Sequence, residues 1–341
     1  MENIRRTSQH KPALAIFAAL GSIWVFVLIT LGAFTTSIGA GMAFPDWPLS
    51  NGSINPSGWL RDVAMFAEHS HRLTGALMGL ITLALALWLW RREDRPWLRQ
   101  LGWWALAIVI LQGLIGGQRV QLDALDVPGF EMSLGQMLRI PHGILAQVYV
   151  CLLIAIAVAS SKSWIERPAP MGAAVRWIGI AGCALLIIQL TIAAVMRHNG
   201  AGLSIPTFPY STLSGHWLPD TWDFRVAFHF AHRAMAVLLA IVLTALAFVV
   251  RRDPASTLAL RAAASALMSL VVLQILLGAQ IIWTLRRPEM TTSHVVVGAL
   301  LLAITFWITW KAHRDAIESR SWHRQLARDL RSHGTAGVSA S

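Results

Sequence analysis

The sequence predicts an all-α membrane protein in which eight transmembrane helices form two pseudo-symmetric four-helix bundles as a tandem repeat. Three observations predict this fold. Only 13% of the 341 residues are charged and 55% are hydrophobic, whereas a soluble domain carries roughly 25% charged residues. Eight apolar stretches are long enough to cross a hydrocarbon core, which takes about 20 helical residues. Finally, residues of the first half recur in the second half at a nearly constant spacing. A disordered chain, a disulfide-rich secreted scaffold and an ordinary cytosolic enzyme are excluded.

The expected spans follow the apolar runs, in order, at residues 12–34, 63–90, 101–119, 139–160, 174–197, 226–250, 259–285 and 292–311. The first span follows basic residues, as a signal peptide does, but its apolar run is longer than the about 7 to 15 residues of a cleaved signal and predicts a retained anchor. The two cysteines, Cys151 and Cys183, lie within spans, so that no disulfide framework is expected.

The basic residues predict the orientation of the chain. Its net charge of +11 would favour nucleic acid in a soluble protein. Most of its lysines and arginines, however, lie at the N-terminus, in the loops after spans two, four and six, and in the tail. By the positive-inside rule both termini are therefore expected in the cytoplasm, and no nucleic acid is expected as a partner. The predicted parts are a cytoplasmic N-terminus (1–11), an N-terminal bundle (12–160), a C-terminal bundle (174–311) and a basic cytoplasmic tail (312–341).

An internal repeat relates the two bundles. One set of residues recurs with a displacement of 161 positions: Thr30, Gly41, Pro45, Pro48, His71 and Arg72 recur as Thr191, Gly202, Pro206, Pro209, His232 and Arg233. Gln112 and Gln118 recur as Gln274 and Gln280, displaced by 162, and His142 recurs as His294, displaced by 152. Each repeat contains an even number of spans, so the halves are expected to share one orientation, related by an axis along the membrane normal.

Histidines near the start of every even-numbered span are the candidate ligands: His69, His71, His142, His229, His232 and His294. The others lie in tails or in the long outer loop, as His198 and His216 do, and are set aside. An ionisable residue within a span is a functional candidate, although a hydrogen bond to a neighbouring helix is the simpler alternative. Zinc needs at least three protein ligands and copper favours added Met or Cys. Two histidines per bundle, His71 with His142 and His232 with His294, predict two bis-histidine haem sites.

The halves differ beside these ligands. Glu68 lies one helical turn before His71 on the same face, and His229 takes its position in the second half. A carboxylate lies beside only one of the two expected haems. This difference suggests that the first half carries out the reaction while the second half carries electrons. The alternative is an ion pair of Glu68 with Arg72 or Arg119. Arg72 and Arg233, which follow their histidines directly, are candidate partners of haem propionates or arginines that snorkel to the interface.

These motifs resemble the haem A synthase family over nearly all of the chain except its tails. The matching segments are Gly39 to Leu49, Glu68-x-x-His71-Arg72, Gln112 to Val120, His142-Gly143, His232-Arg233, and Gln274 to Gln280 followed by His294. The resemblance implies an oxidoreductase that converts the C8 methyl group of haem O to a formyl group for cytochrome oxidase biogenesis. It implies a substrate haem at His71, His142 and Arg72, a haem b at His232, His294 and Arg233, and Glu68 near the reacting methyl. It also implies the bacterial cytoplasmic (inner) membrane, with the haem sites toward the outer side.

One departure from the family concerns thiols, because many members have cysteines where this chain has Phe44 and Ser50. The candidate partners are a haem O synthase, a membrane electron carrier such as quinone, membrane lipid and a second copy of the chain. Two alternative functions stay open: a di-haem cytochrome b-type electron-transfer protein and a non-catalytic haem-binding assembly factor. The sequence assigns no role to His69 and His229.

Overall fold

The computed structural model describes residues 9–166 and 170–319, so the predicted N-terminus and most of the predicted basic tail lie outside the described residues. Each of the eight predicted spans coincides with one long apolar helix, which confirms the eight-helix membrane fold. The helices are α1 (Pro12–Ser37), α2 (Val63–Arg92), α3 (Pro96–Gln121), α4 (Leu134–Ser160), α6 (Ala173–His198), α7 (Phe224–Arg252), α8 (Leu258–Trp283) and α9 (Pro288–Ala312). Two short elements, α5 (Lys162–Ile165) and the 3₁₀ turn η1 (Ala201–Leu203), were not predicted.

Several helices extend beyond the predicted spans because polar residues cap them outside the apolar run. α4 begins at Leu134, five residues before the predicted 139, because the Ser133 side chain accepts a hydrogen bond from the Gln136 amide. Asp223 caps α7 in the same way through the Val226 amide. Hydropathy finds the part of a helix that lies in lipid, whereas capping decides where the helix begins.

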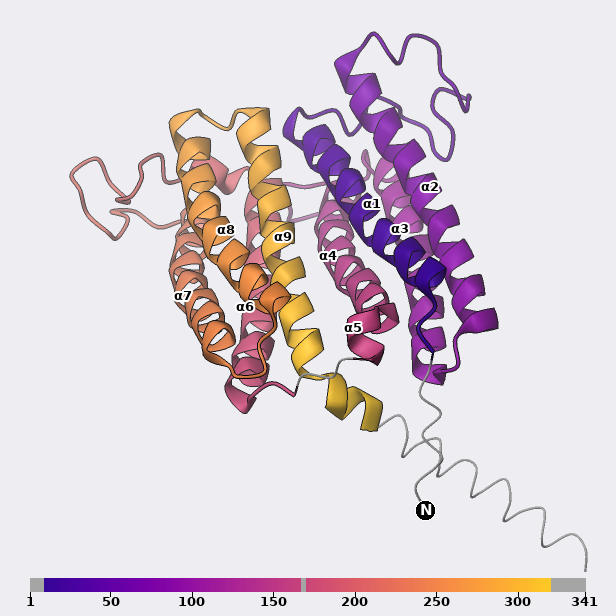
Figure 1. Ribbon diagram of the computed structural model, residues 1–341. Coiled ribbons are helices and arrows are strands. Elements are labelled where there is room, and N and C mark those ends of the chain that lie inside the picture. The colour runs from indigo at the N-terminus through magenta and orange to yellow at the C-terminus, as the bar shows by residue number, and fades with distance from the viewer. Residues whose placement is uncertain (1–8, 167–169, 320–341) are drawn as a thin grey trace, which may run out of the picture.

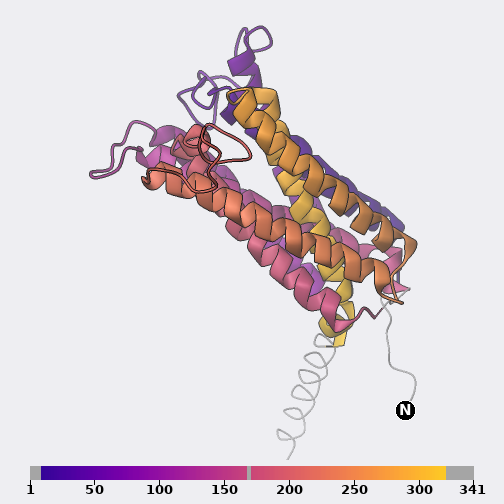
Figure 2. The same ribbon diagram turned by 90° about the vertical axis from the view of Figure 1, so that its left-hand side faces the viewer.

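The helices pack as two rings of four. In the N-terminal bundle, α1 contacts α2 and α4, and α3 contacts α2 and α4; in the C-terminal bundle, α6 contacts α7 and α9, and α8 contacts α7 and α9. The bundles meet where α1 contacts α9 and where α4 contacts both α6 and α9 (Figure 1). The view turned by 90° shows the long helices running roughly parallel (Figure 2). An axis relating the two halves stays a prediction.

Small residues allow close helix contacts, as expected where lipid removes the hydrophobic driving force between helices. A Cβ atom on Gly102 of α3 would lie 2.9 Å from Leu89 of α2, and one on Gly182 of α6 would lie 3.2 Å from Thr305 of α9. Large apolar side chains instead point outward, for example Ile16, which is 61% exposed. The helices therefore bury small side chains against one another and present large ones to lipid.

Gly135, in the first turn of α4, packs against backbone atoms of Arg119 and Asp123, and this contact can be tested by mutation. A Cβ on Gly135 would lie 2.6 Å from the backbone of Asp123, and backbone atoms cannot rotate away. We expect Gly135→Ala to lower the melting temperature in detergent by several degrees, since overpacking costs about 1–3 kcal/mol. Gly143→Ala on the same helix is the matched control, because nothing lies within 4 Å of its Cβ position. An equal loss of stability in both variants would contradict this account of the α3–α4 contact.

Candidate functional site

A cavity of about 1920 Å³ runs between the helices, and each of the eight long helices contributes to its lining. Most of the lining is apolar, and the four repeat-related histidines all face it: His71, His142, His232 and His294. Ligand pockets usually measure about 300–1,000 Å³. The volume, together with histidines from both bundles, suits two macrocycles rather than one.

In the N-terminal bundle, glycines make room for both histidine rings. A Cβ on Gly32 of α1 would lie 2.7 Å from Cε1 of His71, and one on Gly116 of α3 would lie 3.2 Å from Cε1 of His142. Gln112 of α3 donates to the carbonyl oxygen of His142 at 3.0 Å. The rings of α2 and α4 are thus seated against α1 and α3, with the cavity beside them.

In the C-terminal bundle, the structure brings the two histidine rings together. The ring centroids of His232 on α7 and His294 on α9 lie 6.2 Å apart, with their planes at 54°. Gln189 donates to the His232 carbonyl at 3.0 Å, and Gln274 Nε2 lies 3.3 Å from His294 Nε2. These contacts fix both helices at the level of the rings.

The histidine pairs fit the ligand set of a haem iron. Each of the four rings has a buried Nδ1 without a hydrogen-bond partner among the described residues. The 6.2 Å between the centroids of His232 and His294 matches two metal–nitrogen bonds of about 2 Å plus the half-widths of two rings. Within residues 9–166 and 170–319, no three His, Cys, Asp or Glu side chains converge on one point. The ligands therefore come in pairs, as axial coordination requires.

Glu68 lies in the cavity lining of the N-terminal bundle and is only 2% exposed. Its carboxylate accepts hydrogen bonds from the Phe44 amide at 3.1 Å and from Arg72 at 2.7 Å, and Arg119 lies 3.8 Å away. The ion pair considered from the sequence therefore exists, with both arginines. Because the same carboxylate also faces the cavity, pairing and a role beside a ligand are compatible.

At the position equivalent to Glu68 in the C-terminal bundle, an imidazole also accepts a hydrogen bond from the backbone of an outer loop. His229, 4% exposed, accepts the Ile205 amide through Nδ1 at 3.1 Å. Ile205 is the repeat-related residue of Phe44, and His229 is the repeat-related residue of Glu68, because each pair is displaced by 161 positions. Holding the outer loop is therefore common to both residues, and the negative charge belongs to Glu68 alone.

Arg72 and Arg233 bind the outer loops through carbonyl oxygens. Arg72 donates to the carbonyls of Phe44, Asp46 and Leu49 at 3.1, 2.8 and 2.7 Å. Arg233 donates to those of the repeat-related residues, Ile205, Thr207 and Tyr210, at 3.0, 2.6 and 3.2 Å. Most of their donors are thus used by the protein backbone, which leaves few for the propionates considered from the sequence.

The first outer loop folds around Asp46. Its carboxylate accepts the amides of Asn51 and Gly52, both at 2.7 Å, in a turn where these two residues have positive φ. Hydrogen bonds from the amides of Gly52 and Asn51 hold the pKa of the Asp46 carboxyl below its ordinary value. The conformation of the loop around Pro45-Asp46-Trp47 is therefore fixed by hydrogen bonds within the loop itself.

Phe44 and Ser50, where the resemblance to the family led us to expect cysteines, are both buried and pack on His69. Ser50 Oγ lies 3.1 Å from His69 Nδ1, and the Phe44 ring lies 5.8 Å from the imidazole. Trp59 covers the same ring at 4.7 Å. His69, whose role the sequence left open, thus forms the core beneath the first outer loop.

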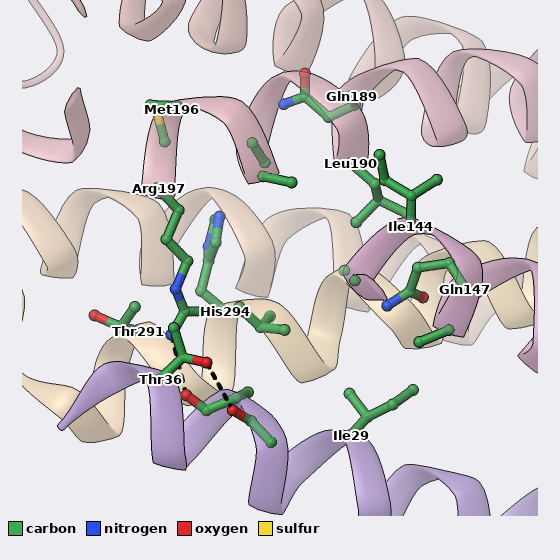
Figure 3. Close-up of a pocket in the computed structure, with 18 of the residues that line it drawn as sticks. Ile29, Thr36, Ile144, Gln147, Gln189, Leu190, Met196, Arg197, Thr291 and His294 are labelled. Carbon is green, nitrogen blue, oxygen red and sulfur yellow. Dashed lines mark hydrogen bonds between the residues drawn. The ribbon is translucent and has the colours of Figure 1, made fainter. Parts of the chain in front are cut away.

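Several basic residues that line the cavity had no role assigned from the sequence, among them Arg197, His198 and Arg286. His198 had been set aside as a loop residue, but it ends α6. Arg197 reaches α1, where it donates to the Ala33 carbonyl at 3.0 Å and to Ser37 Oγ at 2.9 Å (Figure 3). A repeat comparison could have found Arg197, because its repeat-related residue is Thr36.

Comparisons with known proteins agree on one family. The family model described as cytochrome oxidase assembly protein matches residues 60–306. A haem A synthase of Shouchella clausii is 26% identical over 299 residues, which cover 87% of this chain and 94% of that protein. A haem A synthase of Symbiobacterium thermophilum is 27% identical over 260 residues, covering 74% and 77%, and one of Listeria monocytogenes is 24% identical over 319 residues, covering 89% and 97%.

Proposed function

Because the chain belongs to the family of cytochrome oxidase assembly proteins that includes the haem A synthases, we propose that it oxidises the C8 methyl group of haem O to the formyl group of haem A. Haem is thus its substrate or cofactor. We assign haem O to His71 and His142 in the N-terminal bundle, and haem b to His232 and His294 in the C-terminal bundle. The observation that carries this assignment is Glu68, a carboxylate in the cavity where the C-terminal bundle has His229.

The N-terminal side of the cavity also has more glycines in its lining than the C-terminal side. Four of its glycines have larger residues at the repeat-related positions of the C-terminal side: Gly75, Gly79, Gly113 and Gly143 become Ala236, Ala240, Ile275 and Val295. A Cβ atom on three of these glycines, Gly79, Gly113 and Gly143, would meet nothing within 4 Å. A substrate must enter and leave, whereas a resident cofactor benefits from close packing. The difference in glycine content supports substrate binding in the N-terminal bundle.

In the proposed reaction the bound haems supply the redox chemistry, and the chain supplies position and charge. His71 and His142 orient the substrate between α2 and α4. Glu68 offers a fixed negative charge to the methyl carbon, which becomes electron-poor as it is oxidised. The Phe44 amide and Arg72 hold the Glu68 carboxylate in place, so its position does not have to change during the reaction. The apolar lining keeps bulk water away and strengthens these electrostatic contacts. The reaction takes its formyl oxygen from one water molecule and releases four protons and four electrons, and the proposed quinone accepts the electrons.

The proposed setting follows from the distribution of charge. We place the chain in the bacterial cytoplasmic membrane, with both termini in the cytoplasm and the haem sites toward the outer side. Lys11, Arg92 and Arg95 lie together near the end at which α1 begins, which supports this orientation. The partners that we propose are a haem O synthase as the source of substrate and a membrane quinone as the electron acceptor. A C-terminal phosphatase or fluorescent-protein fusion tests the orientation.

Filling the N-terminal side of the cavity should block the substrate. We expect Gly113→Ile, which introduces the residue found at position 275, to lower haem A formation about tenfold or more, because overpacking costs about 1–3 kcal/mol. Haem b content should stay unchanged, since Gly113 lies in the other bundle. The measurement is haem extraction and mass analysis after co-expression with a haem O synthase. Gly113→Ala is the control for the helix itself, and normal haem A with loss of haem b would reverse the assignment of the two halves.

The overall proposal is tested by the product. A membrane preparation of this chain, co-expressed with a haem O synthase, should contain haem A in addition to haem O. The matched preparation without this chain should contain haem O only. Haem b bound to the chain without any haem A would instead favour an electron-transfer cytochrome b.

A further inference from the structure

Three cavity-lining arginines of the C-terminal bundle, Arg197, Arg233 and Arg286, lack an acidic partner among the described residues. Arg233 uses its donors on carbonyls of the outer loop, which leaves Arg197 and Arg286. Arg197 donates only to neutral acceptors, the Ala33 carbonyl and Ser37 Oγ of α1. Arg286, in the loop between α8 and α9, makes no side-chain hydrogen bond or ion pair within residues 9–166 and 170–319. Figure 3 shows Arg197 passing close to His294 on its way to α1. Its guanidinium acts electrostatically on the His294 ring, and Arg286 acts on Arg197.

Two like charges at the edge of an apolar cavity need an anion. A guanidinium within a span is costly unless a partner compensates its charge, and the two guanidiniums also repel each other. Among the described residues, the carboxylate that lines the cavity is Glu68, which is paired with Arg72 and Arg119 in the other bundle. The structure therefore leaves a place for an anionic ligand beside His294.

The conformation of the α8–α9 loop directs Arg286 toward that place. Leu285 and Arg286 have φ values of 52° and 67°, a left-handed region that non-glycine residues seldom adopt. The Arg286 amide closes the end of α8 by donating to the Ile281 carbonyl at 2.8 Å. Its side chain passes over Gly202, where a Cβ would lie 3.9 Å from Arg286 Cδ. Such backbone strain is typical of functional sites.

Among the residues that the structure describes, the cavity-lining arginines of the N-terminal bundle form no such uncompensated pair. Arg72 and Arg119 share Glu68, and Arg139 pairs with Asp123 at 2.8 Å. The repeat-related residues of Arg197 and Arg286 are Thr36 and Ala124, which carry no charge. The chain's own acids thus pair with the cavity-lining arginines of the N-terminal half, whereas Arg197 and Arg286 of the other half are left for a ligand.

We propose that Arg197 and Arg286 bind the propionate carboxylates of the haem in the C-terminal bundle and thereby keep that haem resident, while the internally paired arginines of the N-terminal bundle let the substrate haem exchange. The guanidinium group is the side chain best matched to a carboxylate, through two parallel hydrogen bonds. This inference rests on the proposed assignment of haem b to the C-terminal bundle.

The first experiment measures how fast haem b leaves the purified protein. Haem transfer to excess apomyoglobin is followed by absorbance for the wild type, Arg286→Gln and Arg287→Gln. Arg287 is the matched control, because it pairs with Glu289 at 3.1 Å and does not line the cavity. We expect Arg286→Gln to release haem b at least about tenfold faster, as the loss of a charge-assisted hydrogen bond implies, and Arg287→Gln to behave as the wild type. Equal release from all three proteins would overturn the inference.

A second experiment leaves the protein unaltered and removes the anion from the ligand. The apoprotein is loaded with haem b or with haem b dimethyl ester, whose propionates carry no charge. We expect the free acid to be retained at least about tenfold longer than the ester. Equal retention of acid and ester would overturn the inference and indicate that the arginines hold another anion, such as a lipid phosphate. A wild-type protein that binds neither form would overturn the proposed function itself.

Discussion

Replacing Glu68 by Gln abolishes haem A formation and leaves haem b in place. Glutamine keeps the shape of the side chain and can still accept one of the two hydrogen bonds, from the Phe44 amide or from Arg72, which reach different oxygens of Glu68, but it carries no negative charge. Loss of preorganised charge stabilisation costs about 10²–10³ in rate where one group has been removed from an active site. We therefore expect at least about a hundredfold less haem A, with haem O or a hydroxylated intermediate accumulating.

The measurement is the haem composition of membranes that also contain a haem O synthase. His229→Gln is the matched control, since His229 holds the Ile205 amide as Glu68 holds the Phe44 amide. That variant should still make haem A. If Glu68→Gln makes haem A at the wild-type rate, Glu68 is a structural ion-pair partner and not a catalytic residue.

Removing either His232 or His294 is expected to eliminate the low-spin spectrum of the haem b that we propose for the C-terminal bundle. The two rings lie 6.2 Å apart, and a bis-histidine haem loses its coordination when one ligand becomes alanine. Because a ligand that binds only the folded state stabilises it by mass action, the melting temperature of the haem-loaded protein should also fall. His71→Ala, in the other bundle, should abolish haem A formation and keep the haem b spectrum.

Reduced-minus-oxidised absorbance spectra of the purified variants check this division of labour. His69→Ala is the control for a histidine that packs beneath the first outer loop without lining the cavity. Equal loss of haem b from His71→Ala and His232→Ala would contradict the assignment of separate haems to the two bundles.

The helices could be predicted from the sequence because each is an uninterrupted apolar run of membrane-spanning length. Their ends could not, since side chains such as Ser133 cap a helix outside that run. The histidine ligands were predictable because repetition singled them out from the other histidines. The same comparison of repeat-related positions, made for every residue that lines the cavity, would have shown that Arg197 of the second half corresponds to Thr36 of the first half.

Contacts between the bundles were beyond the reach of the sequence. Arg197 lies at the end of the predicted fifth span, and the direction of its side chain depends on where α6 lies relative to α1, which hydropathy does not report. The partners of Arg72 and Arg233 could not be predicted for a similar reason. Both arginines bind carbonyl oxygens of the outer loops, and a loop has no periodic pattern of apolar residues from which its path could be predicted. The carboxylate of Glu68 and its two candidate ion-pair partners, Arg72 and Arg119, were recognised from the sequence, whereas its hydrogen bond from the Phe44 amide required the folded loop.

The contact between Arg197 and α1 determines whether either half could exist alone. If a gene encoded only α6 to α9, the Arg197 side chain would face lipid without the Ala33 carbonyl and Ser37 hydroxyl that accept its hydrogen bonds. Thr292 of α9 would lose the same Ser37 partner, now at 3.1 Å. Polar groups left unsatisfied in hydrocarbon cost several kcal/mol each. A four-helix protein made of α6 to α9 would therefore be stable only if it lost Arg197 or dimerised. Deletion of the first four spans from this chain should yield a polypeptide that the cell degrades rapidly, not a small cytochrome.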